Sequence, residues 1–195
     1  MPTGQESEEA LVARAIGGDV AAFGQLVERY QDALFNGIYR MVSRREDAED
    51  IAQETFVRAF RAIKRFQARS SLYTWLYSIA VNLVISHRRK ASTAAGRANP
   101  LSLQQLHDAE GRPRELDGHT ERPDEAAERH ERHERVHEAI ARLEPDHRAV
   151  LVLRDIEGFD CRTVAEVLGC PVGTVKSRLH RARLALKKHL KDLLA

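Results

Sequence analysis

Hydrophobic residues recur every three or four positions along most of this chain, a spacing that predicts α-helices rather than strands. In the first half we expect helices over about residues 7–16, 19–42, 43–65 and 70–90. Helical spacing resumes near Asp124, is interrupted at Pro145 and continues to Asp155. We find neither a convincing alternating strand pattern nor an internal repeat, so we expect an all-α fold.

Small polar residues mark the expected helix starts. Asp19 is suited to cap the second helix, because its side chain can accept hydrogen bonds from backbone N–H groups of the first turn. Ser43 and Glu46 have the spacing of a capping box, which predicts that the third helix opens there. Ser70 or Ser71 is expected to open the fourth helix.

Between the two helical halves, residues 91–123 mix Ser, Gly, Pro, Asn and charged residues without periodicity. Such a composition is typical of a flexible linker. We therefore expect two small helical domains, over residues 1–90 and 124–195, joined by a linker over residues 91–123.

The most informative segment runs from Cys161 to Arg183 and reads CRTVAEVLGCPVGTVKSRLHRAR. It predicts a short helix, a break at residues 169–171 and a long helix from near Val172, because glycine accepts positive φ and proline cannot continue a helix. Small polar groups on the long helix suit base edges, and its cations suit phosphates. The segment therefore predicts a helix-turn-helix, with an ordinary helical hairpin bearing a solvated basic face as the alternative. The expected packing stripe of the long helix is Val175, Leu179, Ala182, Leu186 and Leu190.

The distribution of charge is more informative than its sum. The formal net charge of +2 is too small to indicate nucleic-acid binding by the whole chain. Residues 174–195, however, hold seven Lys or Arg against one acidic residue, whereas residues 108–138 hold eleven acidic residues against six Lys or Arg. This segregation favours a localised anion-binding end.

The third predicted helix separates its apolar residues from a charged stripe. Asp47, Asp50 and Glu54 lie on this stripe, which becomes basic at Arg58 and Arg61. Acidic residues first and basic residues last match the helix dipole. The stripe is therefore either a docking surface for a basic partner helix or a dipole-matched solvated face.

The fourth predicted helix carries Trp75 and Asn82 on one stripe, with Tyr73 and Tyr77 beside it and the cations of residues 64–69 just upstream. Aromatic faces, amides and cations together suit unpaired bases, which need stacking, hydrogen bonds and phosphate contacts. The alternative is that Trp75 and Tyr77 are packing residues.

Three strings, in this order, resemble the extracytoplasmic-function (ECF, group IV) sigma factors of bacterial RNA polymerase, within the sigma-70 family. They are DAEDIAQETFVRAFRAIKRF (47–66), SSLYTWLYSIAVNLV (70–84) and LEPDHRAVLVLRDIEGF followed by the helix-turn-helix string (143–183). The resemblance implies a region 2 bundle over 1–90 and a region 4 helix-turn-helix over 124–195. Separately, the sequence shows no phosphate-binding glycine loop and no nucleophile motif, so we expect no catalysis. It implies an alternative sigma factor that binds core polymerase, recognises −35 and −10 promoter elements and helps to melt DNA.

The resemblance also implies roles for individual residues. Docking on the β′ clamp helices of the polymerase is implied for Asp47, Asp50, Gln53 and Glu54. Capture of unpaired −10 bases is implied for Phe66, Gln67, Ala68, Arg69, Tyr73, Trp75 and Asn82. Entry into the −35 major groove is implied for Thr174, Lys176, Ser177, Arg178, His180 and Arg181.

Other partners implied by the resemblance are the β flap of the polymerase, promoter DNA and, because the family often uses one, an anti-sigma factor. One departure concerns His180, where family members often carry an aromatic or aliphatic residue. The −35 base preference is therefore left open.

Two other functions compete with this interpretation. A stand-alone helix-turn-helix regulator would need a dimer face or ligand pocket in the N-terminal half, where we find docking and base-capture stripes instead. A zinc hydrolase is suggested by His133, Glu134 and His137, which match H-E-x-x-H, with Glu157 downstream as a further ligand. The motif lies in a stretch rich in Glu, Arg and His, so we interpret it as solvated helix surface and expect no metal or other cofactor.

Cysteine usage and hydropathy bear on the compartment. Cys161 and Cys170 would bracket a helix, too far apart for a disulfide, which fits a reducing compartment. The longest apolar stretch, Leu72 to Ile85, is too short to span a bilayer, and the N-terminus has no signal-peptide pattern. We expect a soluble cytoplasmic protein with no membrane contact of its own.

Overall fold

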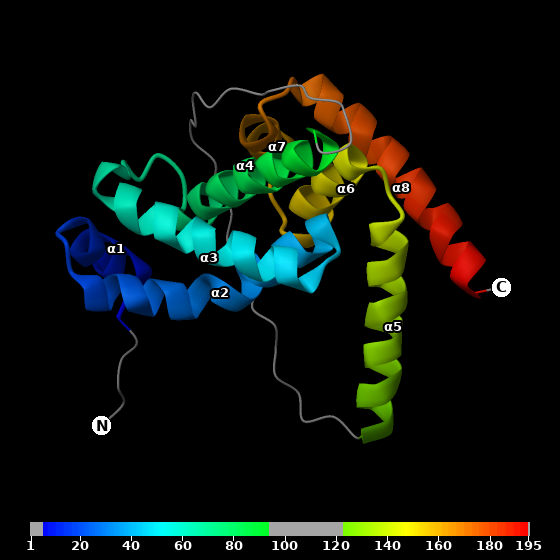
Figure 1. Cartoon of the computed structure of the whole chain (residues 1–195), viewed down its shortest axis with the longest axis horizontal. Coiled ribbons are helices and arrows are strands. Elements are labelled where there is room, and N and C mark those ends of the chain that lie inside the picture. Colours follow the sequence, from blue (N-terminus) through cyan, green and yellow to red (C-terminus); the bar gives the residue numbers. More distant parts are fainter. Residues whose placement is uncertain (1–5, 94–122, 195) are drawn as a thin grey trace.

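The computed structural model describes residues 6–93 and 123–194, except for the side chains of residues 91–93, 123–130, 133 and 193–194. Its elements are all helical, which confirms the all-α prediction (Figure 1). They are α1 (Glu8–Ile16), α2 (Val20–Val42), α3 (Arg45–Ala62), the 3-10 turn η1 (Ile63–Arg65), α4 (Leu72–Thr93), α5 (Pro123–Ala141), α6 (Pro145–Leu151), the π-helical turn η2 (Val152–Ile156), α7 (Cys161–Leu168) and α8 (Val172–Leu194).

Helices α1 to α4 form an N-terminal bundle in which α2 packs against α1, α3 and α4. The buried side of α2 follows the predicted spacing and includes Tyr30, Leu34 and Ile38, which are almost fully buried. Side chains three or four residues apart lie on one face of a helix, so this stripe can pack against three neighbours.

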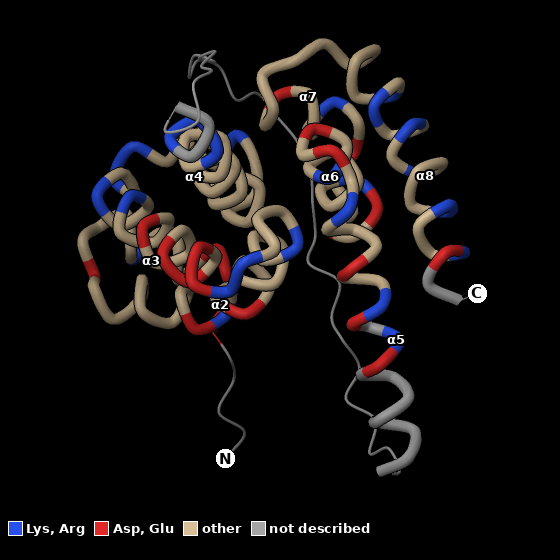
Figure 2. The backbone as a smooth tube through the Cα atoms, turned by 45° about the vertical axis from the view of Figure 1, so that its right-hand side comes forward, with Lys and Arg blue, Asp and Glu red and all other residues tan. Residues whose placement is uncertain are grey.

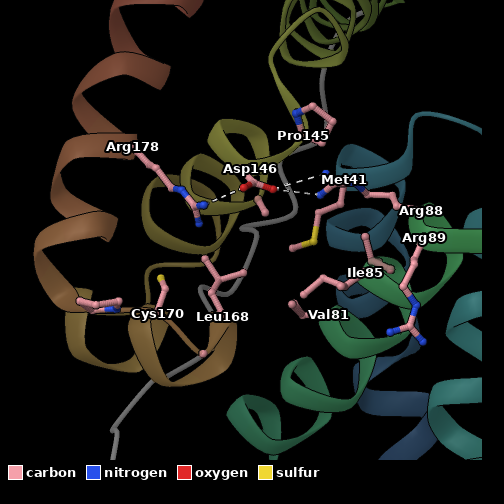
Figure 3. A pocket seen from close by; sticks show the side chains of 14 residues that line it. Met41, Val81, Ile85, Arg88, Arg89, Pro145, Asp146, Leu168, Cys170 and Arg178 are labelled. Carbon is pink, nitrogen blue, oxygen red and sulfur yellow. Dashed lines mark hydrogen bonds and ion pairs between the residues drawn. The ribbon is translucent and has the colours of Figure 1, made fainter. Parts of the chain in front are cut away.

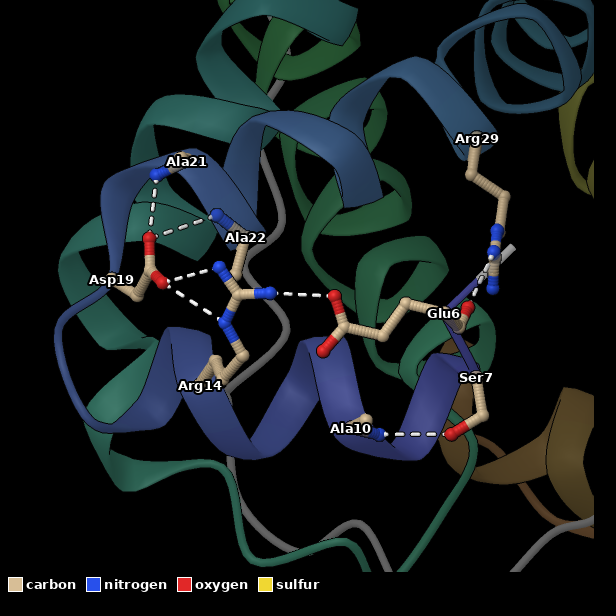
Figure 4. Close-up of polar contacts among 8 residues, drawn as sticks. All are labelled: Glu6, Ser7, Ala10, Arg14, Asp19, Ala21, Ala22 and Arg29. Carbon is tan, nitrogen blue, oxygen red and sulfur yellow. Dashed lines mark hydrogen bonds and ion pairs between the residues drawn. The ribbon is translucent and has the colours of Figure 1, made fainter. Parts of the chain in front are cut away.

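Capping contacts hold the start of this bundle (Figure 4). Asp19 caps α2 as predicted, since its Oδ1 accepts hydrogen bonds from the N–H groups of Ala21 at 2.9 Å and Ala22 at 3.1 Å. Its Oδ2 accepts from Arg14 Nε at 2.9 Å. The Arg14 guanidinium, followed by the backbone bond from Ala22, lowers the pKa of Asp19. The same residue thus ties the end of α1 to the start of α2.

The capping box predicted at Ser43 and Glu46 is wrong. The N-cap residue of α3 is Arg44, which makes no side-chain capping bond. Ser43 instead ends α2 in the left-handed region, with φ at 65°, and its Oγ accepts a hydrogen bond from Arg148 at 2.8 Å. The hydroxyl is therefore used by a helix distant in sequence rather than by the helix that follows it.

Helix α4 is opened by Ser71, one of the two predicted residues. The Ser71 Oγ accepts a hydrogen bond from the N–H of Thr74 at 3.1 Å, which is a capping contact. The helix continues to Thr93, beyond the expected end of the first domain. Most of the expected linker lies outside the described residues, and its role stays a prediction.

Helices α5 to α8 form a C-terminal bundle. Pro145 stands at the start of α6, where its missing N–H is not needed, and Asp160 caps α7 by accepting from the N–H of Thr163 at 2.7 Å. Gly169 ends α7 with φ at 60°, a left-handed conformation that glycine adopts at little cost. These features confirm the predicted helix-turn-helix boundaries, while the π-helical turn after α6 was not predicted.

The two bundles pack against each other. Helix α4 lies on α7, and α2 contacts α5, α6 and η2. Buried apolar side chains of both bundles form one continuous core. This interface joins segments far apart in the sequence, and the periodicity of the chain did not predict it. Within residues 6–93 and 123–194, no helix has the length and apolarity that a membrane crossing needs.

Candidate nucleic-acid interface

The helix-turn-helix presents the N-terminal half of α8 to solvent. Val175, Leu179 and Ala182 are buried as predicted, which fixes the rotation of the helix. All six residues predicted to enter the −35 groove therefore lie on one stretch of α8. Lys176, Ser177, His180 and Arg181 are exposed, whereas Thr174 and Arg178 are half-buried.

Basic residues continue along the rest of α8 (Figure 2). Lys187, Lys188 and Lys191 are exposed. Arg183 differs from them, because it holds Asp155 of η2 through bonds of 2.8 Å from Nε and 2.6 Å from Nη2. This pair braces the middle of α8 against η2, and the three lysines beyond it lie exposed where they could contact an anionic partner.

Arg178 is held at the boundary between the two bundles (Figure 3). Its Nη2 lies 2.7 Å from Oδ2 of Asp146 in α6. The other carboxylate oxygen of Asp146 accepts from both terminal nitrogens of Arg88 in α4, each at 3.3 Å. These residues line a cavity of about 860 Å³ between the bundles, with apolar walls that include Val81 and Leu168.

The turn that precedes α4 brings several predicted −10 residues together. Phe66 packs on Trp75, with ring centroids 5.1 Å apart, so both aromatic rings are half-buried rather than free. Gln67, Ala68 and Arg69 are exposed beside them. Ala68 has φ at 52°, a left-handed conformation that is uncommon for a residue with a Cβ.

Tyr73 and Asn82 lie differently from the other predicted −10 residues. Tyr73 is only 3% exposed and donates a hydrogen bond of 2.5 Å to Oε2 of Glu157 in the C-terminal bundle. Asn82 is half-buried, and its side-chain nitrogen donates to the carbonyl of Ser78 at 2.6 Å. With the bundles packed in this way, Tyr73 cannot reach a base.

An aromatic cluster crosses the interface around Tyr73. Phe159 of the C-terminal bundle is fully buried, 5.7 Å from Tyr73 and 5.3 Å from Tyr77 between ring centroids. Burial raises the pKa of Glu157, while hydrogen bonds from the two tyrosines act in the opposite direction. Burial and the nearby Glu157 in turn raise the pKa of Tyr73. Tyr77 is therefore a packing residue, the second of the two roles considered for it.

Arg148 of α6 makes polar contacts with both bundles. It donates to the carbonyl of Met41 at 3.1 Å and to the Ser43 hydroxyl at 2.8 Å, both at the end of α2. It also donates to the carbonyls of Ala141 and Leu143 at the end of α5. Helix C-termini carry free carbonyls and partial negative charge, so one guanidinium satisfies two helix ends.

The acidic stripe of α3 lies on the N-terminal bundle and is partly paired within it (Figure 2). Asp50 and Gln53 are exposed. Asp47 is mostly covered, with 18% of its side chain exposed, and lies 3.5 Å from His87. Glu54 forms an ion pair of 2.7 Å with Arg58. Asp50 and Gln53 are therefore the most accessible members of the predicted docking set.

An apolar groove on the C-terminal bundle was not predicted. It has a volume of about 440 Å³ and lies between α5, η2 and α8, with walls that include Val136, Ile140 and Leu186. Val136 remains 41% exposed, although Ala139 and Ile140, three and four residues further along α5, are buried. Lys187 and Lys191 stand at the edge of the groove. The helical spacing of Val136 and Ile140 was visible in the sequence, but the exposure of Val136 at the groove is seen only in the structure.

The proposed zinc ligands do not gather in the described part of the chain. The ring of His137 stacks on Tyr39 with centroids 4.2 Å apart, and Glu157 accepts a hydrogen bond from Tyr73. The side chain of His133 lies outside the described residues. No three His, Cys, Asp or Glu side chains among those described come together as a metal site. Cys161 and Cys170 are free thiols.

Two family models match the chain. Sigma-70 region 2 matches residues 26–93 on the N-terminal bundle, and Sigma-70, region 4, matches residues 133–186 on the C-terminal bundle. The RNA polymerase sigma-H factor of Pseudomonas aeruginosa is 42% identical over 193 residues, which cover 97% of each chain. The ECF RNA polymerase sigma factor SigW of Bacillus subtilis is 36% identical over 183 residues, covering 90% of this chain and 92% of the relative.

Two solved structures have a similar fold over most of the chain. CnrH in complex with the cytosolic domain of CnrY matches with a TM-score of 0.64 and 27% identity, covering 96% of this chain and 99% of the other. The sigma factor RpoE in complex with the anti-sigma factor NepR from Bartonella quintana also matches with a TM-score of 0.64, at 26% identity, covering 88% and 98%.

Proposed function

The chain belongs to the ECF group of the sigma-70 family, and from this premise we propose how its surfaces serve promoter-directed transcription initiation. It is a sigma factor, a DNA-binding initiation factor rather than an enzyme, and its partners are core RNA polymerase and promoter DNA. The observation that carries this conclusion is the presence of region 2 followed by region 4, each on its own bundle. Region 2 would act over residues 1–90 and region 4 over 124–195, with residues 91–123 linking them.

The −35 element would be read by the N-terminal half of α8. Exposed Lys176, Ser177 and Arg181 support this assignment, because the buried stripe of α8 turns them toward solvent. Arginine can make two hydrogen bonds to guanine, whereas lysines further along the helix would contact phosphate. We assign Arg178 to the same surface, although its guanidinium is shared with Asp146.

The −10 element would be captured by the turn before α4. Gln67 and Arg69 offer hydrogen bonds and charge, and Trp75 with Phe66 offers aromatic faces. Stacking on an aromatic side chain contributes about 1–3 kcal/mol per base. Tyr73 would take part only after the bundles separate, since it is buried between them in the packed form.

Core polymerase would be bound by two surfaces. Asp50 and Gln53, with Asp47 and Glu54, would face the β′ clamp helices, a role that the exposure of the first two supports. The apolar groove walled by Val136, Ile140 and Leu186 would receive an apolar segment of the β flap.

Separation of the bundles follows from the dimensions of a promoter. The −35 and −10 elements lie about 25 base pairs apart along the DNA, which is roughly 85 Å at about 3.4 Å per pair. A compact chain of this length has a radius of gyration of only about 16 Å. The residues between Thr93 and Pro123 can reach at most about 100 Å when fully extended. The packed form would therefore open when both elements are bound.

The setting would be the cytoplasm, where polymerase works. Because the bundles resemble those of RpoE bound to the anti-sigma factor NepR, an anti-sigma protein would be a further partner. No observation favours a stand-alone regulator, and the region 2 match on the N-terminal bundle is evidence against it.

Run-off transcription tests the function directly. Core polymerase with the full-length chain should give specific transcripts from promoters recovered by genomic selection, and core polymerase alone should not. The expected start sites lie downstream of paired −35 and −10 elements. If no recovered promoter supports specific initiation, the proposed function is wrong.

A further inference from the structure

One carboxylate connects the two bundles through arginines from both. Asp146, in the first turn of α6, holds Arg178 of α8 at 2.7 Å with Oδ2 and Arg88 of α4 at 3.3 Å with Oδ1 (Figure 3). The Arg178 side chain is 30% exposed, and the Asp146 side chain is 51% exposed. Arg178 of the −35 surface is thus held by Asp146, which also forms an ion pair with the N-terminal bundle.

We propose that Asp146 is a positioning residue for the −35 contact of Arg178, and that Arg88 weakens this hold while the bundles are packed together. The inference rests on the proposed function, because it concerns how the same −35 surface is regulated.

The geometry of the pair supports positioning. A guanidinium has five N–H donors in a rigid plane, and Asp146 accepts a single hydrogen bond from the Nη2 of Arg178. The guanidinium also faces the thiol of Cys170, and the donors that neither group uses stay available for the paired acceptors of a guanine. Since the plane is already oriented, less side-chain entropy is lost when DNA binds. Arg181, three residues further on, is exposed and lies beside Arg178 on the same side of α8.

The second arginine acts against this hold. Arg88 places a positive charge on the same carboxylate, so it balances part of the charge of Asp146 and repels Arg178. Asp146 and Arg178 belong to one bundle and stay together when the bundles separate, whereas Arg88 departs with α4. When the bundles separate, Asp146 therefore no longer pairs with Arg88 and holds Arg178 more strongly. Arg178 is then better oriented for DNA in the open form.

A simpler role for Asp146 is also testable. A carboxylate in the first turn of a helix is stabilised by the helix dipole, and that role predicts a change in stability without a change in base preference. Asp155 provides a matched control, because it forms a comparable pair with Arg183 at the middle of the same helix, at 2.6 and 2.8 Å, beyond the six residues proposed to enter the −35 groove.

The experiment measures binding of the full-length chain to a labelled −35 duplex by fluorescence anisotropy, with every single-base substitution of the element. Asp146→Asn should lower the preference at the base that Arg178 contacts by at least about five-fold, the lower end for one bidentate arginine–guanine contact. Arg178→Ala should lose the same preference, and adding Asp146→Asn to it should change nothing more. Asp155→Asn should keep the wild-type preference.

Arg88→Met isolates the interdomain part of the proposal. It should strengthen binding of the free chain to its preferred duplex by up to about five-fold, the range of an exposed ion pair. Unchanged or weaker binding by this variant overturns the role given to Arg88. If Asp146→Asn does not fold, Asp146→Glu, which keeps the charge but moves it, must alter the preference instead.

The positioning role fails if Asp146→Asn keeps the wild-type preference, or if Asp155→Asn loses it equally. A wild-type chain that shows no preference on any duplex, yet supports specific transcription with core polymerase, also overturns the inference while the proposed function stands. Absence of both preference and transcription overturns the two together.

Discussion

Arg148→Met tests whether the junction of the two bundles depends on a single guanidinium. Arg148 donates to the Met41 carbonyl and the Ser43 hydroxyl at the end of α2, and to two carbonyls at the end of α5. Methionine keeps much of the aliphatic stem but removes every donor. The buried acceptors at two helix ends would then lose their partner.

The magnitude follows from the number of acceptors left unpaired. A buried polar group without a partner costs about 1–3 kcal/mol. If water reaches about half of the four acceptors, the loss is about 2–6 kcal/mol. Burial of the guanidinium lowers the pKa of Arg148, because the charged form loses solvation. Relief of that cost offsets part of the loss, so we expect a net destabilisation of about 2–4 kcal/mol.

Urea unfolding followed by two probes measures this effect. Circular dichroism reports all helices, whereas the fluorescence of Trp75, the one tryptophan, reports the N-terminal bundle. We expect a lower midpoint by circular dichroism, with the C-terminal bundle unfolding before the Trp75 signal changes. Arg142→Met is the control, because Arg142 forms an exposed pair with Glu138 and its loss should cost under about 0.5 kcal/mol. Equal midpoints for the two variants would refute the argument.

Three further predictions follow from the structure. Gly37→Ala should destabilise the chain by about 1–3 kcal/mol, because its new methyl group would overlap the Tyr77 hydroxyl. Gly24→Ala, whose methyl group meets open space in the same helix, should instead stabilise the chain by about 0.5–1 kcal/mol. Thermal melts that show the same shift in melting temperature for both variants would contradict this. Glu157→Gln should become more stable relative to the wild type as pH rises. Because the folded-state pKa of Glu157 is raised, its carboxyl contributes to stability below its ordinary pKa of 4.5 and loses that contribution as pH rises through the folded-state pKa. A difference in urea midpoint between variant and wild type that stays constant from pH 4 to pH 8 would exclude this effect. Asp50→Arg should weaken binding to core polymerase by about 2–5 kcal/mol if its contact is desolvated, and helicity should not change because Asp50 is exposed. The assay is a pull-down titration, in which Glu49→Arg is the control because Glu49 is an exposed neighbour outside the proposed docking set.

Local signals in the sequence were sufficient for most helix boundaries. Asp19, Ser71 and Gly169 were predicted from their own chemistry, and each acts within a few residues along the chain. Capping and left-handed turns depend on short-range hydrogen bonds and on φ, so the residue type is enough to indicate them. The buried stripe of α8 is local in the same sense, since helical geometry places residues three or four apart on one face.

Ser43 shows where local reasoning stopped. It matched a capping box with Glu46, yet its hydroxyl accepts from Arg148, 105 residues away. A pattern read over a few neighbouring residues cannot include both Ser43 and Arg148. The same limit applies to Tyr73, whose spacing on α4 suited an exposed base-stacking stripe but whose hydroxyl bonds Glu157, 84 residues away.

The sequence by itself determined the helices, the helix-turn-helix and the family, because these depend on periodicity, caps and strings of neighbouring residues. Only the tertiary structure decided which faces remain open. It buried Tyr73 between the bundles, left Asp50 exposed and placed Asp146 between Arg88 and Arg178. The physical reason is that the helical repeat is fixed by neighbouring residues, whereas burial and ion pairing depend on the distance between groups that come together only when the bundles pack.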